Sequence, residues 1–132
     1  MCPLSETTCP FCGLPPERIL LSDEGVVALF DAYPVTPGHT LVVPTQHVSR
    51  LFELPPDEQL KIWLFTGRVQ RFLAERLTVD SFNIGINDGE AAGQTVDHAH
   101  IHIIPRRLGD LPDPRGGIRW IIPEKADYWT RS

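Results

Sequence analysis

The chain of 132 residues lacks several features that define large classes of proteins. No uninterrupted apolar run approaches the length of about 20 residues that spans a bilayer, which excludes a membrane-spanning helix. The formal net charge is −5 and the basic residues are scattered, so a groove for long nucleic acid is not expected. The N-terminal sequence MCPLSETTCPFCG has neither the basic nor the apolar segment of a secretory signal, and we therefore expect a cytoplasmic protein.

Cysteine is also scarce, with three residues in the chain. In a reducing compartment, so few cysteines indicate metal or redox chemistry more than a disulfide framework. Cys9 and Cys12 form a CxxC motif, which is half of a tetrahedral zinc site, while Cys2 stands apart. A solvated turn and a redox pair are alternative interpretations of this motif.

What the sequence does contain is a set of alternating apolar segments separated by turns that include many of its 13 prolines. Period-two patterns predict five strands, at residues 18–23, 26–31, 39–44, 81–88 and 97–105. The pattern becomes helical over residues 56–77, which begin with a proline and two acids, as the N-terminus of a helix favours. Antiparallel strands with a segregated helix define an α+β fold.

The length predicts a single domain covering residues 1–132. Residues 1–16 are an arm that needs an anchor, and residues 107–132 form an irregular tail with a short strand at 118–122. Gly67 lies inside the predicted helix at a cost of roughly 1 kcal/mol relative to alanine. This cost is either tolerated strain or the sign of a close packing contact.

The sequence HAHIHIIPR, residues 98–106, places His98, His100 and His102 at strict alternation. On a strand these three imidazoles project from one face. They suit metal ligation or nucleophilic catalysis, and the third interpretation is an exposed edge without a role.

The segment just before these histidines favours catalysis. Gly93, Gln94 and Thr95 place a turn, an amide and a hydroxyl beside the first imidazole. A glycine turn that frees backbone N–H groups forms an anion site, which suits a phosphoryl oxygen. Metal ligation alone does not explain this loop.

Taken together, GQTVDHAHIHIIPR resembles the signature of the histidine triad (HIT) family, and PGHTLVVP at residues 37–44 resembles the family's earlier strand. The resemblance covers roughly residues 9–106. It implies a HIT-like fold with an antiparallel sheet of about five strands, one long helix and a short helix. It also implies a homodimer whose sheets join, for which the helix bearing Gly67 is a plausible contact.

The resemblance further implies a nucleotide hydrolase or nucleotidyl transferase that acts at the α-phosphate of dinucleoside polyphosphates or nucleoside phosphoramidates. His100 would be the nucleophile, His102 would bind a phosphate oxygen or help the leaving group, and His39 would orient its neighbours. Having histidine at 102 resembles the hydrolase branches. The implied nucleotide-binding set is Phe11, Leu29, Asp31, Ala32, Asn87, Gly93, Gln94, Thr95, His100 and His102, in which Asp31 meets the ribose, Phe11, Leu29 and Ala32 line the base pocket, and the Thr95 hydroxyl also serves catalysis.

A structural zinc follows from the same resemblance. Once His100 and His102 are engaged with phosphate, His39, His47 and His98 remain as partners for the CxxC motif. Bacterial members of the family with this motif use the equivalents of His47 and His98. The expected zinc ligands are therefore Cys9, Cys12, His47 and His98.

Two other functions stay open on the sequence. One is a zinc-dependent hydrolase in which the triad itself binds the metal. The other is a nucleotide-binding module without turnover.

Overall fold

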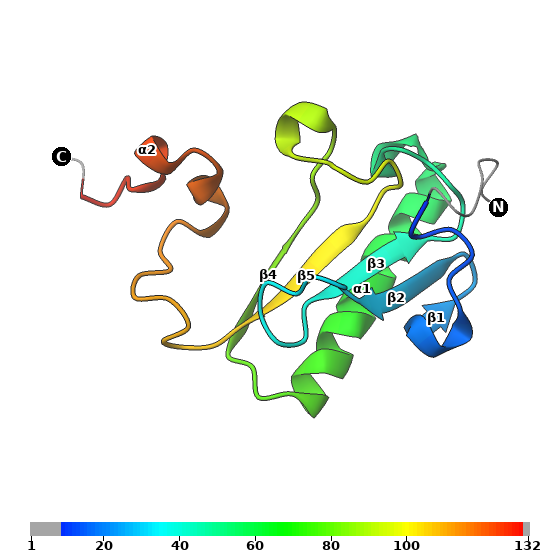
Figure 1. The fold of residues 1–132 in the computed structure, drawn as a ribbon, viewed down its shortest axis with the longest axis horizontal. Helices are drawn as coiled ribbons and strands as arrows, with labels where there is room; N and C mark the ends of the chain where they lie inside the picture. The colour runs from blue at the N-terminus through cyan, green and yellow to red at the C-terminus, as the bar shows by residue number, and fades with distance from the viewer. Residues whose placement is uncertain (1–8, 131–132) are drawn as a thin grey trace.

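The structure, a computed structural model, describes residues 9–130 and is built around one antiparallel sheet of five strands (Figure 1). The predicted α+β fold is confirmed. The order of the strands across the sheet is β1-β2-β3-β5-β4, so the fifth strand is inserted between the third and the fourth. The strands are β1 (Ile19–Asp23), β2 (Val26–Phe30), β3 (Thr40–Pro44), β4 (Ser81–Gly85) and β5 (Ile101–Arg106).

The long helix α1 (Pro56–Arg76) crosses one face of the sheet (Figure 1). Proline at its first position and acidic residues in its first turn match the orphan amides and the positive dipole there. Its buried apolar side chains recur every three or four residues and pack on β2, β3 and β5; they are Ile62, Phe65, Val69 and Leu73. No helix within residues 9–130 is long and apolar enough to cross a membrane.

The other face of the sheet is covered by the N-terminal segment. Leu29 of β2 and Leu41 of β3 belong to a second buried cluster, against which Phe11 and Leu14 pack. Because both faces of β2 and β3 are covered, the residues of these strands are buried without alternation except Phe30, and all but Thr40 are apolar.

The strand that carries the histidines begins later than predicted, at residue 101 and not at residue 97. The residues just before Ile101 do not continue the ladder with β3. Instead, the Ala99 N–H donates to the carbonyl of Val48, and the His98 ring donates to the carbonyl of Pro44. The predicted fourth strand is shorter for a related reason. Its last pair joins Gly85 to His102, near the start of β5.

The C-terminal segment runs away from the sheet, beyond the edge formed by β4 (Figure 1). The prediction of a strand at 118–122 is wrong, because a 3₁₀ helix (Gly117–Ile121) forms there. Gly116 and Gly117 both have positive φ and start this turn, and Pro123 then opens the short helix α2 (Pro123–Ala126). The single long helix and the short one agree with the expected fold.

Candidate functional site

The histidines of the sequence motif gather where β3 and β5 lie side by side. His102 pairs with Leu41 across the two strands, and the His100 ring lies 5.0 Å from the His102 ring. Ala99, Ile101 and Ile103 are buried in the core beneath α1. His102 on β5 and His100 just before it therefore lie on the opposite face of the sheet, whereas His98, which also precedes the strand, is fully buried among the Cys9, Cys12 and His47 side chains.

His39 orients His102 through a chain of hydrogen bonds. The backbone N–H of Val35 donates to His39 Nδ1 at 3.0 Å, so in the neutral ring the proton sits on Nε2. This Nε2–H donates to His102 Nδ1 at 2.9 Å and also lies 3.4 Å from Asp31 Oδ2. His102 therefore carries its own proton on Nε2 and presents it as a hydrogen-bond donor.

Both rings of this chain are held neutral. Burial lowers the pKa of His39, although the carboxylate of Asp31 opposes the shift. Burial, followed by the nearby His100 and His39, lowers the pKa of His102 to about 4. Neutral imidazoles are the form that the hydrogen-bond chain requires.

His100 has the opposite tautomer. Its Nδ1–H donates to the carbonyl of His98 at 2.8 Å, which leaves the lone pair of the neutral ring on Nε2. Neighbouring imidazoles thus present a lone pair and an N–H to the same face of the sheet. This combination suits attack on an electrophile whose oxygen accepts a hydrogen bond.

The glycine-containing loop before the histidines is held together by its own amides. The backbone N–H groups of Gly89, Ala92, Gly93 and Gln94 all donate to acceptors within the loop. These four N–H groups are therefore not the freed donors expected of the glycine turn, and the anion site itself stays a prediction.

The side chain of Gln94 is engaged in the same way. Its Oε1 accepts from Gly89, and its amide nitrogen donates to the carbonyls of Ser49 and Val96. Both amide hydrogens are committed, so Gln94 holds the loop instead of offering a donor to a ligand.

Two further residues of the implied nucleotide-binding set, Thr95 and Asn87, lie near this loop. Thr95 and Asn87 are exposed. A Cβ on Gly93 would lie 3.9 Å from the amide nitrogen of Asn87, so these two residues are neighbours. On the opposite side, Phe11 and Leu29 belong to the apolar cluster beneath the arm, and Ala32 is exposed beyond β2.

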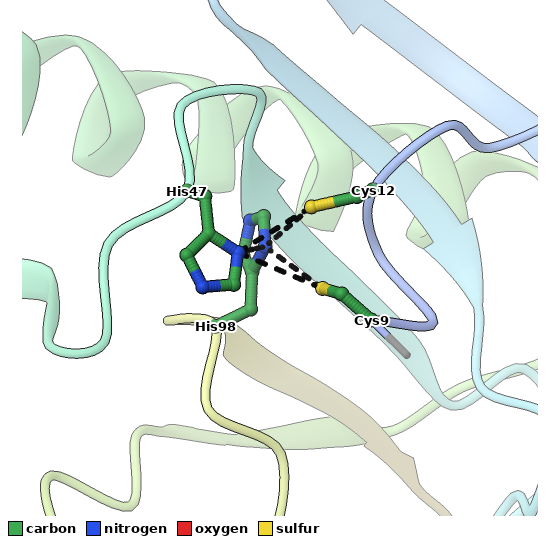
Figure 2. A group of neighbouring side chains, drawn as sticks. All are labelled: Cys9, Cys12, His47 and His98. Atoms are coloured by element: carbon green, nitrogen blue, oxygen red, sulfur yellow. Dashed lines mark hydrogen bonds between the residues drawn. The ribbon is translucent and has the colours of Figure 1, made fainter. Parts of the chain in front are cut away.

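Cys9, Cys12, His47 and His98 converge beside the histidine strand (Figure 2). The distances between sulfur and Nδ1 atoms are 3.4–3.7 Å, and the two Nδ1 atoms are 3.1 Å apart. Tetrahedral zinc with ordinary bond lengths requires about 3.6 Å and about 3.3 Å for these separations. The four donor atoms therefore have the spacing of a tetrahedral zinc site.

The surroundings of His98 agree with this assignment. Its ring is fully buried, and Nε2–H donates to the carbonyl of Pro44 at 2.8 Å, which leaves the Nδ1 lone pair facing the sulfurs. Burial is the largest of the causes that lower the pKa of His98. A backbone carbonyl that fixes the tautomer in this way is the usual support of a metal-ligating histidine.

A second group, Asp31, His39 and His102, also has its ligand atoms close together. Its geometry fits hydrogen bonding better than metal binding. A metal on His39 Nε2 would require a proton on Nδ1, where the N–H of Val35 already donates.

A cleft of about 650 Å³ begins at His39 and His102 and extends over β4 to Trp120 of the tail. Asn83, Gly85 and Asn87 line it, and the sequence analysis identified only Asn87. The period of two along the predicted strand at 81–88 was the available signal, because it places all three residues on one face.

The fold and the site define a class: an α+β protein in which oriented imidazoles lie next to a Cys₂His₂ cluster. The sequence pattern of the HIT domain matches residues 14–109, which is most of the chain. The protein therefore belongs to the HIT family.

Relatives and solved structures agree with this membership. An uncharacterized HIT-like protein of Methanocaldococcus jannaschii is 42% identical over 106 residues, which are 77% of this chain and 81% of that protein. The asymmetrical bis(5'-nucleosyl)-tetraphosphatase of Schizosaccharomyces pombe is 41% identical over 65% of this chain and 47% of its own length. The crystal structure of a zinc-bound histidine triad family protein from Mycobacterium smegmatis is 39% identical, with a TM-score of 0.72 over 83% of this chain and 86% of that one.

Proposed function

We propose that the protein is a nucleotide hydrolase or nucleotidyl transferase that acts at the α-phosphate of a dinucleoside polyphosphate or a nucleoside phosphoramidate. The observation that carries this proposal is the pair of tautomers at the strand: a lone pair on His100 Nε2 and an N–H on His102 Nε2. Relatives about 40% identical include hydrolases of bis-nucleosyl polyphosphates, which supports a nucleotide as the substrate.

The reaction we infer has two steps. The lone pair of His100 Nε2 attacks the α-phosphorus, the bond from that phosphorus to the leaving group breaks, and a nucleotidyl-histidine forms. Water then attacks the same phosphorus, gives its proton to solvent and releases the nucleotide with His100 restored. Throughout, His102 donates its N–H to a non-bridging oxygen, and His39 holds His102 in the donating tautomer.

A neutral His102 suits a phosphate leaving group better than an amine leaving group. Since burial lowers the pKa of His102 to about 4, its ring is neutral at pH 7 and is not a ready proton donor to a leaving amine. A phosphate or polyphosphate departs without protonation, whereas an amine needs a proton. We therefore favour dinucleoside polyphosphates over phosphoramidates.

The remaining contacts follow the expected set with one change. We propose that Asp31 accepts from the ribose, that Phe11, Leu29 and Ala32 line the base pocket, and that Asn87 and Thr95 meet the phosphates. Gly93 and Gln94 serve by shaping the loop that carries Thr95.

The experiment that tests the function is to trap the covalent intermediate. Wild-type protein and the His100→Asn variant are mixed with labelled diadenosine tetraphosphate, quenched within milliseconds and mapped by mass spectrometry. We expect an adenylyl group on His100 in the wild type, and loss of turnover by a factor on the order of 10⁴ in the variant. Binding of adenosine monophosphate (AMP) should survive in both, because the substitution leaves the base and ribose contacts in place.

Near wild-type turnover by His100→Asn would rule out the nucleophile. AMP binding without any turnover by the wild-type protein would instead favour a nucleotide-binding module. A parallel screen with adenosine phosphoramidate tests the preference for the leaving group.

We propose that Cys9, Cys12, His47 and His98 hold one zinc ion. With four protein ligands the site is closed to substrate, so a bound zinc would supply a structural cross-link between the N-terminal arm and the histidine strand. Both sulfurs must be thiolates for this, which fits a cytoplasmic, reducing location and requires a reductant during purification.

The metal proposal predicts about one zinc per chain by elemental analysis of protein purified with a reductant. The Cys9→Ser, Cys12→Ser double variant should contain almost none, because serine hydroxyls are poor zinc ligands. The Cys2→Ser variant is the matched control and should keep its zinc; Cys2 itself lies outside the described residues. Full zinc content in the double variant would contradict the ligand set.

We also propose that the protein is a homodimer, as the family resemblance implies. The outward face of α1 supports this, since Leu60, Trp63 and Leu64 are exposed there and Gly67 follows on the same stripe.

A further inference from the structure

His98 belongs to both the metal cluster and the nucleotide site. Its ring directs Nδ1 toward Cys9 and Cys12, at 3.4 and 3.7 Å (Figure 2). Its backbone carbonyl accepts the hydrogen bond that sets the tautomer of His100. A movement of His98 that displaces this carbonyl would therefore disturb the bond that orients the His100 ring.

Phe11 provides a second connection between the two sites. It lies between the two cysteines in the sequence, and its ring packs edge-on against the rings of both His98 and His100. The centroids are 5.8 and 5.1 Å apart, within the range of favourable aromatic pairs. Phe11, which is expected to line the base pocket, therefore has candidate metal ligands near it in the chain, Cys9 and Cys12, and another, His98, against its ring.

The state of the cluster decides how firmly Phe11 is held. A metal ion would bond both cysteines and both histidine nitrogens, which fixes the CxxC loop on His98. In reduced protein without an ion, the contacts between the cysteine sulfurs and the histidine nitrogens are hydrogen bonds of 3.4–3.7 Å, which are weaker than metal–ligand bonds. Without the metal, nucleotide binding must also order Phe11, which costs conformational entropy. In the metal-bound protein Phe11 is already ordered, so this cost does not weaken nucleotide binding.

We propose that the zinc cluster and the nucleotide site are thermodynamically coupled, and that Phe11 is the positioning residue that transmits the coupling. The proposal rests on the proposed function and adds to it a role for the metal beyond support of the fold. Coupling of this kind is reciprocal, so zinc tightens nucleotide binding and nucleotide tightens zinc binding by the same factor.

The test is a thermodynamic cycle with AMP as the probe. The dissociation constant of AMP is measured by calorimetry for zinc-loaded and chelator-treated protein, both kept reduced and both checked for fold by circular dichroism. We expect AMP to bind roughly tenfold more weakly without zinc. In the Phe11→Ala variant both constants should be weaker and nearly equal, whereas the Leu14→Ala control, altered on the same arm beyond the CxxC loop, should keep the tenfold difference.

The reciprocal measurement starts from zinc-loaded, reduced protein. Zinc is partitioned at equilibrium between the protein and a chromophoric chelator, with and without saturating AMP, and AMP should raise the zinc affinity of the wild type roughly tenfold. An unchanged zinc affinity in the wild type, or full coupling in Phe11→Ala, would overturn the proposal. Absence of AMP binding by zinc-loaded wild-type protein would overturn the proposed function itself, which is a different result.

Discussion

The tautomers of His39, His98 and His100 depend on backbone groups whose hydrogen-bonding roles cannot be reversed. A carbonyl oxygen can only accept and a backbone N–H can only donate, so Val35 fixes His39, Pro44 fixes His98, and the carbonyl of His98 fixes His100. His102 is fixed in turn by His39. The tautomers that the proposed nucleophile, donor and metal ligand require are therefore set mainly by backbone partners.

The low pKa of His102 makes the stability of the protein depend on pH. Between about pH 6.5 and pH 4 the unfolded chain takes up a proton at this residue that the folded protein does not, so the free energy of unfolding falls as the pH falls. In the His102→Gln variant this contribution disappears, and the slope should be shallower by about 1.4 kcal/mol per pH unit within that window.

Urea unfolding of the two proteins from pH 4.5 to 7.5, with equal zinc in all samples, measures both slopes. The wild type and the variant share the pKa shifts of His39 and His98, so only the difference between the slopes reports on His102. Identical slopes would show that His102 titrates normally in the folded protein.

At the scale of the elements, the connection from β2 to β3 places His39, and Gly38 permits its path. Gly38 has a φ of +91°, and a Cβ there would lie 2.5 Å from Leu77 Cδ1 and 3.2 Å from Pro105 Cγ. The connection thus packs tightly against the end of α1 and against β5. A side chain at this position must push away residues that hold the histidine face in place.

The Gly38→Ala variant should therefore lose about 3 kcal/mol of stability, from left-handed strain plus overpacking. Gly109→Ala is the matched control: its φ is +87°, and a Cβ there meets no atom within 4 Å, so strain alone should cost about 1 kcal/mol. Chemical denaturation of both variants gives the comparison. Equal losses would mean that the packing at Gly38 does not constrain the connection.

Periodicity was enough to predict the elements but not their ends. The helix over 56–77 was predicted to within one residue, because its apolar spacing and its proline start are local signals. The start of β5 was missed, because it depends on bonds from residues 98 and 99 to Pro44 and Val48, which lie about fifty positions earlier. The mainly apolar sequence IRWII, residues 118–122, predicts a strand. A 3₁₀ helix forms instead, because Gly116, with a positive φ, starts a turn just before it.

The site shows the same division between local and distant causes. The residues of the metal cluster and the triad are brought together as the motifs indicated. The backbone partners that choose each tautomer left no sequence signal, since any residue supplies a carbonyl or an N–H. The engaged amides of the 89–94 loop were missed for the same reason.

At the scale of the whole molecule, the sheet has its two faces covered by different means. Helix α1 covers one face with a continuous apolar cluster, and the arm with Phe11 covers the other with a smaller cluster. The Cys9, Cys12, His47 and His98 cluster joins this arm to the segments that follow β3 and precede β5. The helix, by contrast, has a second apolar stripe that faces outward.

The outward stripe predicts how two copies associate. Leu60 and Leu64 are 62% and 64% exposed, and with Trp63 and Gly67 they follow the spacing of one helix face. In a twofold dimer each substitution occurs twice, so Leu64→Lys places two charges in the interface at roughly 2 kcal/mol each, which weakens association roughly a thousandfold. Light scattering coupled to gel filtration should show a dimer for the wild type and a monomer for Leu64→Lys at micromolar concentration. Leu108→Lys, at an 89% exposed position in the tail, is the control and should remain dimeric, and a dimeric Leu64→Lys would place the contact on another surface.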